Sequence, residues 1–87
     1  MKMNVIIVYD VKASRTQKLC DYLRKWLTWR QNSVFDGELT QSEYKEIKSG
    51  LDGLVQGDDQ VIVYKVSNPD WVETETIGES LEDNRFL

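Results

Sequence analysis

Two short apolar runs constrain the fold of this chain of 87 residues more than any other feature. Residues 4–9 read Asn-Val-Ile-Ile-Val-Tyr, and residues 61–66 read Val-Ile-Val-Tyr-Lys-Val. Runs of this length, rich in β-branched residues, are typical of strands. The first run is apolar enough to predict a central strand covered on both faces. Because Asp10 ends that run, we expect its carboxylate at the C-terminal edge of the sheet, where α/β folds often bind ligands.

Two segments between these runs have the spacing of amphipathic helices. Residues 14–17, Ser-Arg-Thr-Gln, have the form of a capping box with a serine N-cap, and apolar residues follow at positions 19, 23, 26 and 27. Residues 40–43, Thr-Gln-Ser-Glu, have the same form and precede apolar residues at positions 44, 47, 51 and 54. We therefore expect one helix after each box, and a turn at residues 57–59 before the second apolar run.

The remaining segments are weaker in pattern. Residues 30–39 are extended and form either one strand or two strands that bend near Asn32-Ser33 or Gly37. Residues 71–77 alternate loosely after Pro69 and predict a short edge strand. The order of elements predicts an α+β fold, a ferredoxin-like α/β sandwich with the order βαββαβ plus a short C-terminal strand. We expect one domain over residues 1–78, with its edge strand at about 71–78, and an acidic tail over residues 79–87.

The length of the chain favours an oligomer. A domain of this size buries only about 60–65% of the surface that its unfolded chain exposes, which leaves a thin margin of stability. Three tryptophans, four tyrosines and two phenylalanines provide apolar surface for further burial. We therefore expect a homodimer.

Composition excludes several kinds of site. The lone Cys20 excludes an internal disulfide and every multi-cysteine zinc pattern. The absence of histidine excludes Ser-His-Asp chemistry, histidine-ligated zinc and imidazole acid–base catalysis. We see no charged-then-apolar leader and no apolar run near the ~20 residues of a membrane span. We expect a cytoplasmic protein with no membrane partner.

The charge is distributed unevenly along the sequence, although the net charge is −4. Residues 1–30 contain seven basic and two acidic residues, whereas residues 31–87 contain four basic and thirteen acidic ones. Phosphate binding depends on the local field rather than on net charge, so a basic face on an acidic body is compatible with nucleic acid. The alternative is a solvated helix face that happens to be basic.

Asp10 is the residue best placed for chemistry. A lone carboxylate at a strand end is more often a cap or an ion-pair partner. Magnesium is usually held by one or two carboxylates together with waters and substrate phosphates. A two-fold dimer would place two copies of Asp10 around a shared axis, because an isologous interface duplicates every residue on it. The residues alone leave both interpretations open.

Basic and aromatic side chains are candidates for nucleic-acid contacts. Arg15 and Arg30 are suited to clamp phosphates, and Lys18 lies on the same basic helix as Arg15. It is an equally good interpretation that these are ordinary exposed surface residues. Tyr9 and Phe35 are suited to stack on bases or to support the site, but aromatic residues that alternate in a strand are more often core.

Several motifs together resemble one known family. They are Val-Tyr-Asp-Val at residues 8–11, the basic helix, Gln-Asn-Ser-Val-Phe-Asp-Gly-Glu-Leu-Thr at residues 31–40, and the second apolar run. This combination, which covers residues 4 to about 66, resembles CRISPR-associated protein two. The segment at residues 31–40 is its most specific part, and Asp36 stands where glutamate is commoner.

The resemblance implies a homodimer of ferredoxin-like fold, whose C-terminal strand pairs with the partner's sheet. It implies work beside the CRISPR integrase in spacer acquisition, the capture of short DNA for insertion into the array. Several family members have been assigned metal-dependent endonuclease activity on RNA or DNA. The aspartate of the family's Tyr-Asp motif corresponds to Asp10, which would be the magnesium ligand, with one ion shared between the two Asp10 residues of a dimer. Arg15 and Arg30 carry over less directly, because the family's basic residues vary in position.

Three functions follow as hypotheses. In a nuclease, magnesium at Asp10 would polarise a phosphodiester and activate a water, and Arg15 or Arg30 would stabilise the developing charge. In a non-catalytic scaffold, the dimer's basic face would hold duplex DNA while its acidic body docks the integrase. The third alternative is a stand-alone RNA-cleaving toxin of similar fold.

Overall fold

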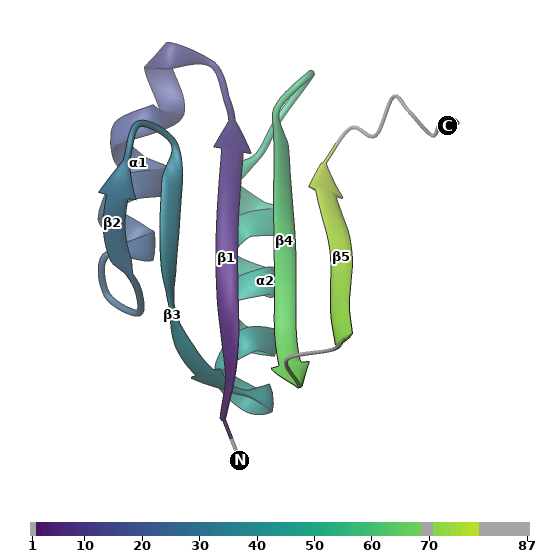
Figure 1. Ribbon diagram of the computed structural model, residues 1–87. Helices are drawn as coiled ribbons and strands as arrows, with labels where there is room; N and C mark the ends of the chain where they lie inside the picture. Colours follow the sequence, from purple (N-terminus) through teal and green to yellow (C-terminus); the bar gives the residue numbers. More distant parts are fainter. Residues whose placement is uncertain (1, 69–70, 79–87) are drawn as a thin grey trace.

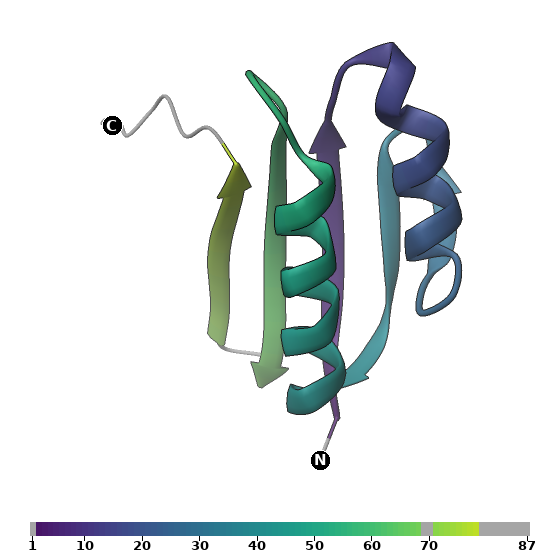
Figure 2. The same cartoon turned by 180° about the vertical axis from the view of Figure 1, so that it is seen from behind.

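A computed structural model gives the fold and describes residues 2–68 and 71–78. The elements of this part of the chain, in order, are β1 (Lys2–Asp10), α1 (Ala13–Leu23), β2 (Thr28–Gln31), β3 (Val34–Thr40), α2 (Gln41–Leu54), β4 (Gln60–Asn68) and β5 (Trp71–Gly78). They form two layers, with both helices on the same face of the sheet (Figures 1 and 2). The predicted ferredoxin-like α+β arrangement, including the C-terminal strand, is confirmed. The acidic tail predicted for residues 79–87 lies outside the described residues.

The sheet has the strand order β2-β3-β1-β4-β5. Every neighbouring pair is antiparallel. β1 occupies the centre, where Ile7 lies between Phe35 of β3 and Val63 of β4. The predicted central position of the first apolar run is therefore confirmed.

The extended segment between the helices is a hairpin of two strands, which resolves the alternatives left by the sequence. The chain turns at Asn32-Ser33, and Asn32 has a φ of 42°, a left-handed conformation that asparagine tolerates better than most residues. Gly37 does not bend the chain and instead lies within β3. A Cβ at Gly37 would lie 2.9 Å from the Leu27 side chain, so glycine allows this close approach.

The helix α1 differs from the prediction at both ends. Its N-cap is Lys12 and makes no side-chain capping bond, so Ser14 lies inside the first turn and the predicted capping box is wrong. The backbone N–H of Lys12 donates instead to the side chain of Asp59, which fixes where the helix begins. At the other end, the N–H of Trp26 bonds to the carbonyl of Leu23 in a tight turn, so the helix stops before the last two residues of the predicted apolar stripe. Trp26 still packs against the core, as predicted.

The helix α2 begins as predicted. Its capping box is complete, because the Glu43 N–H donates to Thr40 Oγ1 at 3.1 Å and the Thr40 N–H donates to Glu43 Oε1 at 2.8 Å. Such a cap typically contributes about 1 kcal/mol. The expected face is buried through Tyr44, Ile47 and Leu51.

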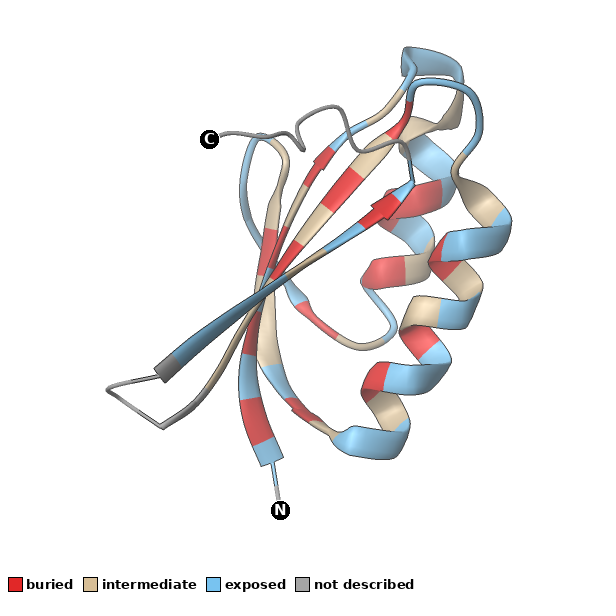
Figure 3. Cartoon of the chain, turned by 90° about the vertical axis from the view of Figure 1, so that its right-hand side faces the viewer, coloured by how far each residue is buried: buried red, intermediate tan, exposed pale blue. Residues whose placement is uncertain are grey.

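Only one face of the sheet is covered by described residues, as the edge-on view shows (Figure 3). Val5, Ile7 and Val63 are fully buried beneath the helices, whereas Ile6 on the opposite face is 36% exposed and Val72 is 57% exposed. Contrary to the prediction, the described residues of one chain cover β1 on one face only. The apolar run reflects a central position within the sheet, and its outward face has no covering layer in the part of the chain that the structure describes.

Candidate functional site at the Asp10 end of the sheet

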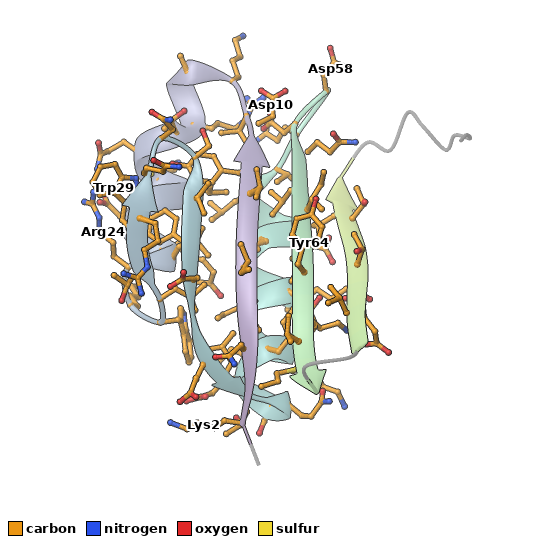
Figure 4. All side chains as sticks on the ribbon, in the orientation of Figure 1. Lys2, Asp10, Arg24, Trp29, Asp58 and Tyr64 are labelled. Carbon is orange, nitrogen blue, oxygen red and sulfur yellow. The ribbon has the colours of Figure 1, made fainter. Side chains whose placement is uncertain are left out.

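Asp10 is the last residue of β1 and lies at the end of the sheet, opposite Gln60 of β4. Its side chain is exposed, and its carboxylate makes no hydrogen bond or ion pair with residues 2–68 or 71–78. Asp10 lines a shallow pocket of about 500 Å³. Figure 4 shows Asp58, another residue of this pocket, at the same end of the sheet. Asp10 therefore offers an open anionic group, and it is neither a helix cap nor a partner of Arg15.

Asp59 is the charged residue of this region that the sequence did not identify. It is 3% exposed, and its carboxylate accepts hydrogen bonds from the Lys12 N–H at 2.8 Å, the Gln56 N–H at 3.1 Å and Arg15 Nε at 2.5 Å. These bonds connect the loop that follows Asp10 to the loop that precedes β4. The Arg15 guanidinium and the backbone donors hold the pKa of Asp59 well below its usual range, despite the opposing effect of burial.

The three predicted phosphate ligands lie in different places. Arg15 lines the Asp10 pocket but is paired with Asp59, and its terminal nitrogen also donates to the Gln56 carbonyl at 3.3 Å. Lys18 is exposed on α1, beside a groove bordered by residues of α2. Neither residue shares its pocket with Arg30.

Arg30 lies on β2, and its Nε donates to Asp36 at 2.8 Å. It borders a different shallow pocket, formed with residues of β1 and β3. Of the three predicted ligands, Arg15 alone lines the pocket of Asp10. Sequence spacing placed all three on the basic segment but does not show which of them have anionic neighbours from distant parts of the chain.

Tyr9 and Phe35 are core residues, so the suggestion that they stack on bases is not supported. Tyr9 is 6% exposed and Phe35 is fully buried, with their ring centroids 6.1 Å apart. The Tyr9 hydroxyl lies 3.0 Å from Cys20 Sγ and donates to the Asn32 carbonyl at 3.3 Å. Burial, followed by the contact with Cys20, raises the pKa of Tyr9 to about 12, so its hydroxyl stays protonated. Tyr9 thereby supports the strand end that carries Asp10.

The carboxylates present limit which metal this site suits. No group of three or more aspartates, glutamates or cysteines is gathered in a metal-binding arrangement within residues 2–68 and 71–78. The oxygens of Asp59 already accept three hydrogen bonds, which leaves Asp10 and the exposed Asp58 as the open carboxylates of the pocket. One or two carboxylates fit magnesium, which keeps several waters and binds substrate phosphates. A closed structural site would need more ligands.

Comparison with known proteins identifies the family of this chain. The model of the family described as CRISPR associated protein Cas2 matches residues 3–74. The chain belongs to the Cas2 family. The resemblance that the sequence motifs indicated is therefore confirmed.

Related Cas2 proteins support this placement. The protein named CRISPR-associated endoribonuclease Cas2 of Methanocaldococcus jannaschii is 52% identical over 64 residues, which are 72% of this chain and 56% of that protein. The protein of the same name from Methanosarcina acetivorans is 43% identical over 77 residues, which cover 87% of this chain and 88% of that protein. A solved structure titled "Crystal structure of cas2" matches with a TM-score of 0.76 at 32% identity, covering 100% of this chain and 99% of the other.

Among the described residues, neither helix has the length and apolar character needed to cross a membrane.

Proposed function

We propose that this Cas2-family chain is a metal-dependent endonuclease of single-stranded RNA or DNA that acts in CRISPR spacer acquisition. The observation that carries the proposal is the open carboxylate of Asp10, exposed at the end of the central strand and unpartnered among the described residues. The family relatives cited above are named endoribonucleases, which supports the same chemistry. The nucleic acid would lie across this end of the sheet.

The active form proposed is a homodimer that uses the uncovered face of the sheet. Ile6 is 36% exposed there, and Tyr64 projects from the same face of β4 (Figure 4). Val72 extends this apolar surface to the edge strand, with 57% of its area exposed. A second copy packed on this face would bury apolar surface that a single small domain leaves in water. Two-fold symmetry would then bring a second Asp10 to the same axis, supplying the carboxylate that one chain lacks.

Magnesium fits the donor set, since Asp10 of each protomer would hold it through hard anionic oxygen. When bound, such an ion would polarise a phosphodiester and lower the pKa of a bound water. Arg15 is held in place by Asp59 at the wall of the pocket, so its remaining donors are oriented for a phosphate oxygen. Lys18 and Arg30 would contact phosphates further along the strand.

A non-catalytic scaffold is the second candidate, and the small number of carboxylates favours it. In that function the dimer would hold DNA beside the CRISPR integrase subunit, and Asp10 would not take part in chemistry. The charge of Arg15 is already balanced by Asp59, so nucleic-acid attraction would come from Lys18 and other unpaired basic residues. The family membership makes a stand-alone RNA-cleaving toxin the weaker alternative.

Replacing Asp10 distinguishes the nuclease from the scaffold. We expect Asp10→Asn to abolish magnesium-dependent cleavage of single-stranded RNA and DNA, because a neutral amide is a poor replacement for a carboxylate on magnesium. Its melting temperature and nucleic-acid affinity should remain close to those of the wild type, because the carboxylate has no partner among the described residues to lose. The matched control is Asp52→Asn, which removes the same charge from an exposed position of α2 outside the pocket and should retain cleavage.

Three measurements on these variants separate the accounts: cleavage with and without magnesium, thermal melting, and spacer acquisition in cells. Wild-type-like cleavage by Asp10→Asn would remove Asp10 from the active site. Absence of cleavage by the wild type, with acquisition equal in both proteins, would establish the scaffold instead.

A further inference from the structure

Trp29 is an exposed aromatic residue whose position the proposed nuclease site does not explain. Its exposed fraction is 49%, and all four residues of β2 are exposed. Among residues 2–68 and 71–78, β2 is an edge strand of the sheet and pairs with β3 alone. The indole Nε1 donates to the Asn32 carbonyl at 3.0 Å, so the ring is held in one orientation although much of it faces solvent. An oriented, half-exposed indole presents a flat apolar surface at little entropic cost on binding.

Neither the core nor the proposed dimer accounts for this exposure. Trp26, three residues earlier, is the tryptophan of this region that packs against the core. Trp29 lies opposite Phe35 on β3, and the Phe35 ring is buried beneath the helices. Because directly opposed residues project from the same face of a sheet, Trp29 does not project from the uncovered face that a second copy would occupy. A second copy on the uncovered face would explain the exposure of Ile6 and Val72, the other large apolar residues exposed in the described part of the chain, but not that of Trp29.

A positive charge lies at the same edge of the molecule as the indole. Arg24 is exposed and forms no ion pair with the described residues, unlike Arg30, which is bound to Asp36. Figure 4 shows Arg24 and Trp29 at the same edge of the molecule. The Trp29 indole and the Tyr9 hydroxyl donate to the same Asn32 carbonyl. The charge of Arg24 acts at a distance on this hydroxyl and lowers the pKa of Tyr9, against the larger effect of burial.

We propose that Trp29 and Arg24 form a stacking site for an unpaired base of single-stranded nucleic acid, with the indole beneath the base and the guanidinium on an adjacent phosphate. Base stacking on an aromatic side chain, combined with a nearby arginine, is a common way to bind single strands without sequence preference. This inference rests on the proposed nucleic-acid function and adds the place where an unpaired nucleotide is held.

The site lies away from the proposed point of cleavage. Trp29 is two strands across from β1 and level with Ile7, because it pairs with Phe35 and Phe35 pairs with Ile7. With strands ~4.8 Å apart and a rise of ~3.3 Å per residue, Trp29 is about 14 Å from Asp10. The stacked base is therefore a few nucleotides from the phosphate at Asp10, and it contributes to affinity rather than to the chemical step.

The experiment compares two 12-nucleotide single strands, one complete and one with abasic sites, which keep the phosphates but remove the bases. Binding of each is measured for the wild type and for Trp29→Leu, which preserves apolar bulk without an aromatic face. We expect the leucine variant to bind the complete strand about 5- to 150-fold more weakly. We expect both proteins to bind the abasic strand with the same low affinity.

Three further variants give independent readouts. Trp29→Phe keeps a ring and should retain most of the affinity for the complete strand, which separates loss of stacking from loss of folding. Arg24→Gln should weaken binding of complete and abasic strands alike. It should also reduce the slope of log binding constant against log salt concentration by about 0.7, the value for one phosphate contact on a single strand. In a Trp26→Phe, Trp71→Phe background, the complete strand should quench Trp29 fluorescence and the abasic strand should not.

The outcomes also separate this inference from the proposed function. If the wild type binds neither strand at low salt, the proposed function fails and the stacking site fails with it. If the wild type binds but Trp29→Leu binds the complete strand equally well, only the stacking site is overturned, and Trp29 is then a contact for a protein partner or a cover for the hairpin. An equal loss on both strands would likewise overturn stacking.

Discussion

The carboxylate of Asp59 should be essential to the stability of the Asp10 end of the sheet, and Asp59→Asn tests this. An asparagine has a single acceptor oxygen, so at least one backbone N–H, of Lys12 or Gln56, would face an amide NH₂ and lose its acceptor. A buried donor left unpaired costs about 1–3 kcal/mol. Replacing a charge-assisted bond by a neutral one adds about 1 kcal/mol. We therefore expect a loss of about 2–4 kcal/mol, which lowers the melting temperature of a domain of this size by roughly 8–30 °C.

Melting followed by circular dichroism measures this loss, with Asp58→Asn as the matched control. Asp58 is adjacent and exposed, so its replacement should change stability by less than about 0.5 kcal/mol. The pKa of Asp59 is held below its usual 3.8, so its charge contributes stability that is fully present above that value and is lost as the pH falls through the depressed pKa. The difference between wild type and Asp59→Asn should therefore shrink below about pH 4. Equal melting of the two asparagine variants at pH 7 would refute the reasoning.

Two further predictions concern the helix α2 and the dimer. Gly53→Ala should stabilise the chain by about 0.5–1 kcal/mol, because a Cβ at this helical position meets open space. Gly50→Ala should give no such gain, because its Cβ would overlap the Tyr22 hydroxyl, and urea melts of the two variants compare them directly. Ile6→Glu should shift the protein from dimer to monomer in sedimentation, whereas Gln41→Glu, an equal charge change on an exposed helix position, should not; a dimer that persists in the Ile6 variant would place the interface elsewhere.

Secondary structure was largely predictable from the sequence because its signals are local. Thr40 and Glu43 lie three residues apart and bond to each other, so the pattern that predicts the capping box contains both partners. The box predicted at Ser14 failed because its competitor is distant: Asp59 binds the Lys12 N–H and fixes the start of the helix. No pattern in residues 12–17 reports that contact.

The candidate site was predictable at Asp10 and unpredictable around it, for the same reason. A carboxylate at the end of an apolar strand can be recognised from the sequence alone. The buried state of Asp59 does not, because two successive aspartates after a glycine are typical of an ordinary turn. Likewise, the sequence placed Arg15 and Arg30 among the basic residues of the first segment, but their partners Asp59 and Asp36 become neighbours only through the sheet and its loops.

The central position of β1 has a consequence for the order in which the protein folds. The strand is made first, yet Val5 pairs with Gly37 on one side and with Lys65 on the other, so about half of its pairing waits for β4. The β2–β3 hairpin and α2 form from neighbouring residues and are available earlier. Pairing between strands that lie far apart in the sequence slows folding, because the entropic cost of closing the long loop comes before the contacts that stabilise the pair. During synthesis, an apolar strand with two open edges is therefore present before its second neighbour exists, and that interval is when the chain is most open to aggregation and to chaperones.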